Sequence, residues 1–462
     1  MHERESWGSN FGFLMAAIGS AVGLGNVWGF PYKMGIGGGF AFLITYLLLV
    51  LFCGCVVMFV EMTIGRKTGK SPIRAFLEIG TFKKLGWFGA ICGFLILAFY
   101  SWIGGCCIKY LFTYISELCG GAGFGGMSGL DYFVQFGSNP ASGIFYLGLF
   151  MLLTLLVVQG GISKGIEKFN VVGMPALLVL MVILIIKNLS LPGASAGLAF
   201  MFTWPTEGFN FFNTLRMAGG QMLFSLSLGM GCMLTYGSYL SKKESIPKNA
   251  FIIPFADTLM ALLAGLMVIP AVFAFGLDPQ GGPLLLFYTM KEVFAAMGSA
   301  GAIFGIMFFL LLIVAALTSA MSLLEVVTSC AIDVRAGKGK SANRRPIACC
   351  CALAIFILGI PVAIDGAGIS GLMPQFTFLA DGSESWLDLY DTIAEGLLMP
   401  LGSVLMCLVV SRKLGFDWVN EEVTACGQKW LAEGFYRVSI KYITPVLMSF
   451  VLVSLFLSYF GI

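Results

Sequence analysis

Residues 19–31 read GSAVGLGNVWGFP, a glycine-rich polar break inside a stretch that is otherwise apolar enough to span a bilayer. Backbone that leaves a helix inside a membrane loses its internal hydrogen bonds, and this is tolerated only where it is buried in protein or lines a cavity. Carbonyl groups freed in this way bind small cations, and the amide ends of half-helices favour anions. The break therefore predicts a joint binding site for Na⁺ and a carboxylate.

The composition is that of a protein with many membrane spans. Hydrophobic residues make up 58% of the 462 positions and charged residues 11%, and the mean hydropathy is +0.92. Soluble domains carry about 25% charged residues. The net charge of +3 lies in short loops, so it indicates membrane orientation and gives no support to nucleic-acid binding.

Eleven apolar runs are long enough to be membrane helices. The first cannot be a cleaved signal peptide, because it contains Asn26 and Trp28 and no small-residue cleavage pattern follows it. The predicted spans lie near residues 11–32, 40–63, 87–112, 143–158, 170–187, 217–239, 252–275, 302–330, 347–363, 390–411 and 440–460.

Lys and Arg distinguish the two sides of the membrane. The loops at 116–142 and 364–389 contain neither residue, whereas Lys and Arg collect at 64–86, 240–249, 331–346 and 412–439. Basic loops stay in the cytoplasm. We therefore predict a multi-pass protein of the plasma (inner) membrane with a cytoplasmic N-terminus and, after eleven spans, an extracellular C-terminus.

The sequence gives little support to enzyme chemistry. Its 13 cysteines lie mostly within the predicted spans, where free Cys serves as a small apolar residue. The only histidine, His2, lies in the N-terminal tail, so no Ser-His or Cys-His pair can form inside the fold. There is no zinc-ligand spacing and no phosphate-binding loop of the Walker type. We predict that the protein is not an enzyme.

A second polar break lies five spans after the first. Residues 221–231 read QMLFSLSLGMG, with hydroxyls at Ser225 and Ser227 and glycines at Gly229 and Gly231. Interrupted helices in matching positions of two halves indicate an inverted-repeat transporter with its site at the midplane of the membrane. The alternative is that the glycines allow close helix packing without unwinding.

Four motifs point to a family: SAVGLGN at 20–26, EMTIGR at 61–66, FSLSLG at 224–229 and AALTSA at 315–320. On these motifs the chain resembles the neurotransmitter:sodium symporter family, in its bacterial amino-acid transporter branch. The resemblance extends from the N-terminal tail to the span at 390–411. It implies the leucine-transporter fold, an all-α polytopic membrane protein with helices 1 and 6 broken and, here, 11 transmembrane helices.

The resemblance also implies how the chain is divided. Helices 1–5 and 6–10 would form a 5+5 inverted repeat, related by a pseudo-two-fold axis in the membrane plane. The expected segments are a cytoplasmic gating tail at 1–10, the first repeat at 11–187, an extracellular loop at 188–216, the second repeat at 217–411, and a cytoplasmic loop with helix 11 at 412–462.

Two sodium sites are implied by the resemblance. A hard cation requires oxygen ligands. Sodium site 1 would touch the substrate carboxylate and use Ala21, Asn26, Ser225 and Asp257, the last at a helix-7 position where many relatives have asparagine. Sodium site 2 would use carbonyl groups and hydroxyls of Gly19, Val22, Ala315, Thr318 and Ser319. The two hydroxyls could instead bond back to their own helix.

Asp257 also bears on chloride. Chloride-dependent relatives hold the anion beside sodium site 1 with residues that match Tyr46, Gln221 and Ser225. A carboxylate inside a membrane is costly and marks an ion or proton pathway. We predict that Asp257 substitutes for chloride, that no chloride is needed, and that this carboxylate could take up a proton on the return step.

The implied substrate is an amino acid held between the two breaks. Its carboxylate would meet the amides of Ala21, Gly23 and Gly25 and the Tyr100 hydroxyl, and its ammonium group the carbonyls near Phe224, Ser225 and Ser227. Its side chain would meet Ile96, Phe224, Met230, Ala320 and Leu323. Burying an unpaired polar side chain against this apolar lining is costly. The predicted substrates are therefore hydrophobic, and Met230 between two glycines lets the pocket repack around bulky side chains.

A gate is expected on the cytoplasmic side. Arg4 and Trp7 match the tail that closes this path in relatives by pairing with an aspartate at the end of helix 8, here Asp333, near Tyr239. Glu61 matches a carboxylate that accepts hydrogen bonds from the unwound helix 6. It could equally be a solvated charge at a helix end.

The outer gate departs from the family pattern. Relatives have an arginine two residues before the helix-1 proline, where this chain has Gly29. Asp391 matches the acidic partner of that arginine. Lys33, one turn beyond Gly29, could replace the arginine if its stem reaches down, or serve only as an interfacial anchor.

Together these features predict sodium-coupled symport of hydrophobic L-amino acids by alternating access, with a hydrophobic amino acid, sodium ions and the lipid bilayer as partners. Two alternatives stay open. One is an amino-acid sensor that does not transport, and the other is a carrier of the same fold with a different substrate or coupling ion. A channel would need a continuous polar pore or rings of charge, and the spans offer only isolated polar residues.

Overall fold

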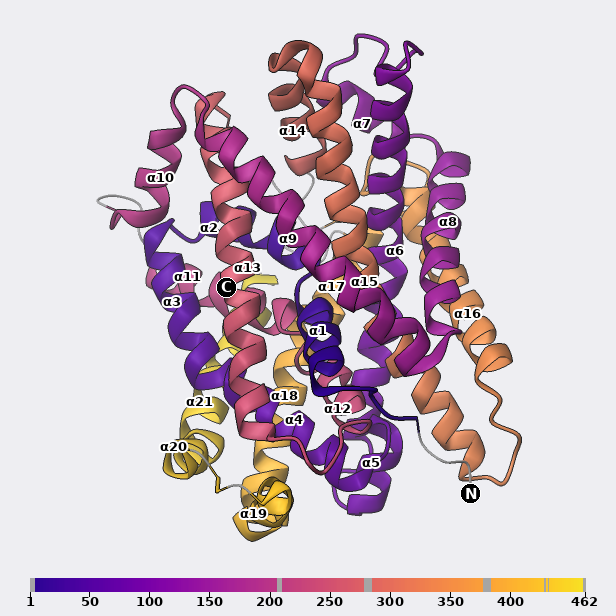
Figure 1. Cartoon of the computed structure of the whole chain (residues 1–462), viewed down its shortest axis with the longest axis vertical. Coiled ribbons are helices and arrows are strands. Elements are labelled where there is room, and N and C mark those ends of the chain that lie inside the picture. The colour runs from indigo at the N-terminus through magenta and orange to yellow at the C-terminus, as the bar shows by residue number, and fades with distance from the viewer. Residues whose placement is uncertain are drawn as a thin grey trace.

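The computed structural model describes residues 5–205, 210–277, 285–376, 384–427, 429–430 and 432–459. Within these ranges all regular secondary structure is helical, which confirms the predicted all-α class (Figure 1). Several long helices contain a π-helical turn, labelled η, in which the backbone is locally widened.

Nine helices in the described part of the chain are long and apolar enough to cross a membrane. Four of them are composite: α3 (Phe40–Leu49), η2 (Val50–Gly54) and α4 (Cys55–Thr68); η3 (Ile162–Glu167) and α9 (Lys168–Leu189); α17 (Trp386–Asp391), η5 (Thr392–Leu398), α18 (Met399–Val409) and η6 (Val410–Leu414); and α20 (Glu433–Val438), η8 (Ser439–Ile443) and α21 (Thr444–Tyr459). The other five are α6 (Leu85–Leu118), α8 (Pro140–Val158), α13 (Ile246–Ala274), α15 (Gly301–Ala336) and α16 (Arg344–Asp365).

Two further predicted spans are broken, as their glycines suggested. α1 (Asn10–Ala21) is followed after a short break by η1 (Gly25–Gly29) and α2 (Phe30–Ile36), and the two halves are bent by 45°. α11 (Phe211–Ser225) and α12 (Cys232–Gly237) flank a turn segment at 226–231. The eleven spans expected from hydropathy therefore correspond to nine long helices, one bent pair and one broken pair.

Short helices connect the spans, and hydropathy did not predict them because each is too short to cross a membrane. The expected loop at 188–216 contains one of them, α10. They are α5 (Pro72–Ile79), α7 (Gly129–Gly137), α10 (Ala194–Phe202), α14 (Leu285–Ala296) and α19 (Phe416–Val423), with single 3-10 turns η4 (Gly298–Ala300) and η7 (Thr424–Cys426).

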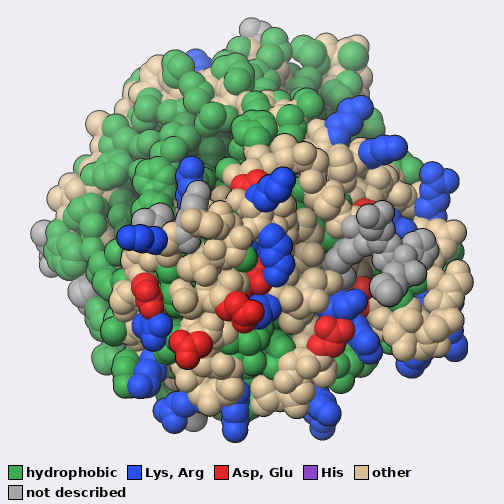
Figure 2. All heavy atoms as spheres, turned by 60° about the horizontal axis from the view of Figure 1, so that its bottom comes forward, with side chains coloured by type: hydrophobic (Ala, Val, Ile, Leu, Met, Phe, Trp, Pro, Cys, Tyr) green, Lys and Arg blue, Asp and Glu red, His purple; other side chains and the backbone are tan. Residues whose placement is uncertain are grey.

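Basic residues gather at one end of the helix bundle. The N-terminal tail, α5, α19 and α20 lie at this end, the lower one in Figure 1, and α7, α10 and α14 lie at the other. Figure 2 shows Lys and Arg side chains spread over this end and mostly hydrophobic side chains on the adjoining flank. Exposed members include Lys83, Lys84, Lys242, Lys243, Lys338, Lys340, Arg412 and Lys413. We call it the basic end and the other the opposite end.

The centre of the bundle is closely packed around the two broken helices. α6 and α15, of 34 and 36 residues, pack along each other. α4 and α12 approach even more closely, because a Cβ on Gly65 would lie 2.0 Å from the Leu234 carbonyl oxygen. Gly65 belongs to the EMTIGR motif, so the glycine of that motif is explained by helix contact.

Candidate functional site

The two breaks face each other in the middle of the bundle. The Ser227 hydroxyl donates to the Ser20 carbonyl (2.9 Å), and the Gln221 amide donates to the Gly25 carbonyl (2.8 Å). Carbonyl groups on both sides of the first break are thus in contact with side chains of the second polar segment. The glycines unwind the helices here, and the alternative that they only allow close packing does not describe these segments.

Glu61 of α4 caps the second break. Its carboxylate accepts hydrogen bonds from the backbone amides of Gly229 (2.7 Å) and Leu234 (3.2 Å), and the side chain is fully buried. Ser227, Gly229 and Gly231 all have positive φ, so this backbone cannot satisfy its own amides as a helix does. Glu61 is therefore a structural acceptor for the unwound segment and not a solvated charge at a helix end.

Oxygen atoms from α1 and α15 converge at the residues expected for sodium site 2. The Thr318 hydroxyl lies 3.3 Å from the Val22 carbonyl oxygen and 2.8 Å from that of Ala315. The Ser319 hydroxyl lies 3.0 Å from the Ser20 carbonyl oxygen and 3.5 Å from that of Gly19. Thr318 therefore bonds back to its own helix and also faces the break. This all-oxygen donor set suits a hard cation such as Na⁺.

A second polar cluster surrounds Asp257 of α13, and it joins three of the four residues expected for sodium site 1, whereas the fourth, Ala21, lines the cavity described below. The Asp257 carboxylate accepts hydrogen bonds from the Asn26 amide (2.7 Å), the Ser225 hydroxyl (2.8 Å) and the Tyr46 hydroxyl (3.4 Å). All four side chains are buried. A buried carboxylate with neutral donors is suited to hold a cation, because no lysine or arginine among these partners neutralises it.

A small cavity lies between the breaks and these two clusters. Its volume is about 20 Å³, room for about one water molecule. The Tyr100 hydroxyl accepts a hydrogen bond from the Leu24 amide (3.0 Å) at its edge. The residues that line the cavity are Ser20, Ala21, Gly23, Gly25, Ile96, Tyr100, Phe224, Ser227, Met230, Ser319 and Leu323.

This lining differs from the expected substrate contacts at four positions. Ser225 and Ala320 do not line the cavity: the Ser225 hydroxyl points to Asp257, and Ala320 is buried within α15. Ser20 and Ser319 line it in addition. Helical periodicity could have placed Ser319 there, since it lies one turn before Leu323 on the same helix.

Comparison with known proteins identifies the family. The sequence profile described as the Sodium:neurotransmitter symporter family matches residues 4–120 and 142–461. This chain belongs to that family. A sodium-dependent transporter of Bacillus subtilis, YhdH, is 34% identical over 97% of both chains, and one of Methanocaldococcus jannaschii, MJ1319, is 32% identical over 91% of this chain and 84% of its own.

One solved structure of a transporter is similar to this chain in both sequence and fold. The crystal structure of MhsT in complex with L-phenylalanine is 37% identical to this chain, covers 98% of it and 100% of MhsT, and superposes with a TM-score of 0.87. The fold predicted from the motifs is therefore confirmed. The mouse sodium- and chloride-dependent neutral and basic amino acid transporter B(0+) is 24% identical over 98% of this chain and 79% of its own.

In this symporter the N-terminal tail packs at the basic end. The Trp7 indole donates to the Tyr236 carbonyl (3.0 Å), the Trp7 amide lies 3.5 Å from the Tyr239 carbonyl oxygen, and the indole ring meets both tyrosine rings edge-on. Arg4 lies outside the described residues. Asp333 accepts a hydrogen bond from the Ser71 amide (2.7 Å).

An ion-pair network beside the tail was not predicted from the sequence. The Arg344 guanidinium pairs with Glu325 (2.5 Å) and Glu5 (2.8 Å), and the Tyr239 hydroxyl donates to Glu325 (2.7 Å). Asp333 and Tyr239 line the same cavity of about 890 Å³ at this end, but the Tyr239 hydroxyl bonds Glu325. These partners come from distant parts of the chain, so only the fold reveals them.

The outer gate expected near α2 has a different ion pair from the one predicted. Lys33 forms its ion pair with Glu395, one turn after Asp391, and the two side chains are 16% and 10% exposed. The lysine ammonium also lies 5.9 Å from the centre of the Phe224 ring. Phe224 and Gly25 separate the small cavity from a larger one of about 340 Å³ that Lys33 and Glu395 line. The long Lys33 side chain thus extends towards Phe224, and its ammonium group pairs with Glu395 instead of Asp391.

Proposed function

We propose that this symporter transports hydrophobic L-amino acids, aromatic and large aliphatic, with sodium and without chloride, by alternating access. The observation that carries the proposal is the small cavity between the breaks, which has mostly apolar walls and lies against two clusters of buried oxygen atoms. Backbone groups there suit an amino acid's charged ends, and the walls suit its side chain.

The walls of the cavity support a hydrophobic substrate. Ile96, Met230 and Leu323 belong to its apolar part, and none of the described residues that line it has a charged side chain. A polar substrate side chain would lose its hydrogen bonds to water without finding new partners. The solved structure of MhsT with L-phenylalanine supports the same class, since that relative binds an aromatic amino acid.

Two oxygen clusters support the use of two sodium ions. We assign Asn26, Ser225, Asp257 and the Ala21 carbonyl to one, and Thr318, Ser319 and the carbonyls of Gly19, Val22 and Ala315 to the other. Asp257 supplies a fixed negative charge beside the first. A bound anion at this place would be repelled by that charge, which is why we propose that chloride is not required.

The two ends would then open in turn. We propose that the basic end faces the cytoplasm, as expected for loops rich in Lys and Arg. Trp7 packed on Tyr236 and Tyr239, together with the Glu325–Arg344 pair, would close the cytoplasmic path. The Lys33–Glu395 pair next to Phe224 would close the outer path. A substrate enters the 20 Å³ cavity only if these contacts and the side chains around it rearrange.

Uptake into proteoliposomes tests the proposal. We expect labelled Trp and Leu to accumulate under an imposed Na⁺ gradient in chloride-free buffer, and not under a K⁺ gradient. Binding without accumulation would favour the sensor alternative. Accumulation that ignores sodium, or that requires chloride, would contradict the assignment of the ions.

Ser319→Ala should weaken sodium coupling. One oxygen ligand is removed from site 2, and a hydrogen-bonding group facing a charge contributes about 1.5–3 kcal/mol. The sodium concentration for half-maximal uptake should rise about 10- to 100-fold. Ser329→Ala is the control, because its hydroxyl donates to the Val326 carbonyl of the same helix and Ser329 is not among the residues assigned to either sodium site. Equal effects of the two variants would remove Ser319 from the site.

The Lys33–Glu395 pair predicts a charge-dependent outer gate. Because the pair is largely buried, Glu395→Gln should reduce uptake more than loss of a surface pair would, by about fivefold to tenfold. The exchange Lys33→Glu with Glu395→Lys should restore at least half of the uptake. Asp391→Asn, one turn away, should have the smaller effect. If Asp391→Asn is instead the more damaging change, Asp391 is the gate partner.

A further inference from the structure

We infer that Arg66 and Glu422 are positioning residues of the gate at the basic end. They hold the connection between α12 and α13 so that it presents Tyr236 and Tyr239 to the tail. Neither residue touches the substrate cavity, and both lie outside the motif positions assigned to ions or substrate.

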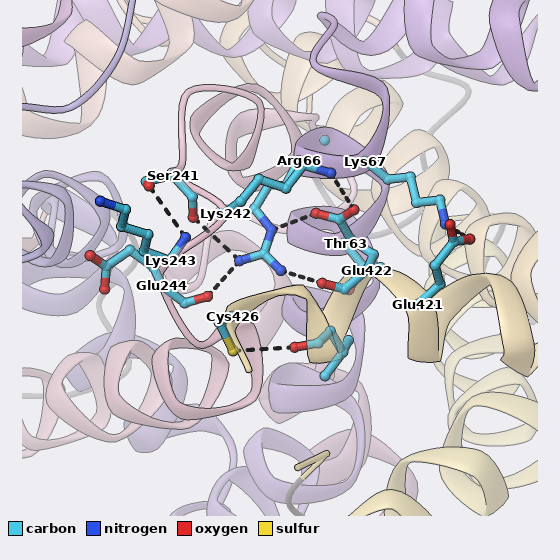
Figure 3. A network of polar contacts seen from close by, with 12 residues as sticks. Thr63, Arg66, Lys67, Ser241, Lys242, Lys243, Glu244, Glu421, Glu422 and Cys426 are labelled. Atoms are coloured by element: carbon cyan, nitrogen blue, oxygen red, sulfur yellow. Dashed lines mark hydrogen bonds and ion pairs between the residues drawn. The ribbon is translucent and has the colours of Figure 1, made fainter. Parts of the chain in front are cut away.

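Arg66, at the end of α4, uses all three nitrogens of its guanidinium (Figure 3). Nε donates to the Glu422 carboxylate (2.7 Å) and Nη2 to the Glu422 carbonyl (2.6 Å) on α19. Nη1 donates to the Glu244 carbonyl (2.5 Å) and lies 3.4 Å from that of Ser241, both in the connection. One side chain therefore ties three segments that are far apart in the sequence.

The ion pair between Arg66 and Glu422 is buried. The Arg66 and Glu422 side chains are only 1% and 2% exposed, and Lys242 of the connection adds a second cation to Glu422 (2.7 Å). A buried charge that loses its partner is strongly unfavourable. Glu422 thus fixes the plane of the guanidinium, and that plane aims Nη1 at the connection.

The anchored connection carries the gate residues. Ser241 follows Tyr239 by two residues, and Tyr239 contacts Glu325 through its hydroxyl and the Trp7 amide through its carbonyl. Arg66 therefore holds one side of this short segment while Trp7 and Glu325 hold the other. Gly65, next to Arg66, sets α4 directly against α12, so the anchor and the gate share one rigid contact.

The contacts of Arg66 affect how the basic end opens during transport. Arg66 joins α4, the connection and α19, whereas Glu325 and Arg344 belong to α15 and α16. Opening the basic end requires the Tyr239 hydroxyl to separate from Glu325. The hydrogen bonds of Arg66 to the connection, which form the anchor, make Tyr239 move together with α4. Without the anchor the connection is free, and the tail loses the fixed surface on which Trp7 rests.

The test compares Glu422→Gln with Glu421→Gln in the full-length protein. Glu421 is a matched control: it is the neighbouring residue on α19, 78% exposed, and its pair with Lys67 is a surface contact of small effect. Hydrogen exchange is measured at residues 5–12 of the tail and 238–245 of the connection, together with substrate binding and uptake.

For Glu422→Gln we expect exchange in both segments to rise about tenfold, since local opening sets the exchange rate. The maximal uptake rate should fall about fivefold while the substrate dissociation constant stays within about twofold. Glu421→Gln should leave all three measurements within about twofold. Faster exchange in the connection without any change in the tail would overturn the inference.

Arg66→Lys is the second variant, in case Glu422→Gln does not fold. Lysine keeps the charge near Glu422 but lacks the fork that reaches the Ser241 and Glu244 carbonyls. The Arg66→Lys variant should therefore bind substrate and still show faster hydrogen exchange in the tail. If both variants lose substrate binding, Arg66 and Glu422 serve folding and not the gate, and the inference is wrong.

Discussion

Replacing Asp257 by asparagine should lower the apparent sodium affinity about 10²- to 10³-fold and make the remaining transport depend on chloride. A unit charge about 4 Å from a cation contributes about 4 kcal/mol at an effective dielectric constant of 20, which corresponds to about three decades of affinity. Asparagine keeps one acceptor oxygen for the Asn26 amide, but it removes the charge and replaces the oxygen that accepts from Ser225 and Tyr46 with an NH2 group. Chloride could then supply the charge, with Tyr46 and Ser225 as donors.

The measurement is sodium-driven uptake of Leu at several sodium concentrations, with chloride or gluconate as the anion. Asp365→Asn is a matched control, because that carboxylate is also buried but accepts hydrogen bonds from the Gly368 (2.9 Å) and Trp386 (3.1 Å) amides away from the site. It should change expression or stability without altering the chloride response. Asp257→Asn with normal sodium affinity and no chloride response would contradict the proposed role of Asp257.

Sequence motifs predicted the centre of the molecule because its chemistry is local. Gly23 and Gly25 in one break and Gly229 and Gly231 in the other are visible as glycines inside apolar runs. The facing hydroxyls of Thr318 and Ser319 follow from their adjacency on one helix and from the family resemblance. The structure brings these segments together as expected.

Contacts between charges far apart in the chain could not be predicted in the same way. Glu395 and Lys33 are separated by 362 positions, and Glu422 and Arg66 by 356. From sequence alone Asp391 and Glu395 are equally placed on one face, one turn apart, and the choice between them depends on how the helix packs. At Glu395 the structure adds a π-helical turn, and Gly220 on α11 leaves room, since a Cβ there would lie 2.6 Å from the Glu395 carboxylate.

The surroundings of Gly229 and Gly231 bear on how the pocket adapts to its substrate. Gly229 and Gly231 suggested free movement of the backbone around Met230. In the structure a Cβ on Gly229 would lie 2.3 Å from the Met399 carbonyl oxygen, and one on Gly231 would lie 2.7 Å from the Pro72 ring. Neither position has room for a side chain, so both require glycine, and we propose that the flexible Met230 side chain adapts the pocket to its substrate.

Met230→Phe should therefore exclude the largest substrates. Phenylalanine fills space near Ile96 and Leu323 that the unbranched thioether can vacate by changing rotamer. A steric mismatch of this size in an apolar pocket discriminates by about 1–3 kcal/mol. The ratio of Trp to Leu uptake should fall about 10- to 200-fold, with Leu uptake itself reduced much less.

The matched variant is Met230→Leu, which conserves volume and costs less than about 1.5 kcal/mol in a packed core. It should keep the Trp to Leu ratio within about threefold, because leucine leaves the same space at the end of the cavity. Competition of unlabelled Trp, Phe, Ile and Leu against labelled Leu gives the ratios for both variants in one experiment. If Met230→Phe lowers Trp and Leu uptake equally, the side chain supports the break and does not set substrate size. Preserved Trp uptake would mean that the cavity enlarges elsewhere, for example by movement of Phe224, which lies between it and the larger cavity.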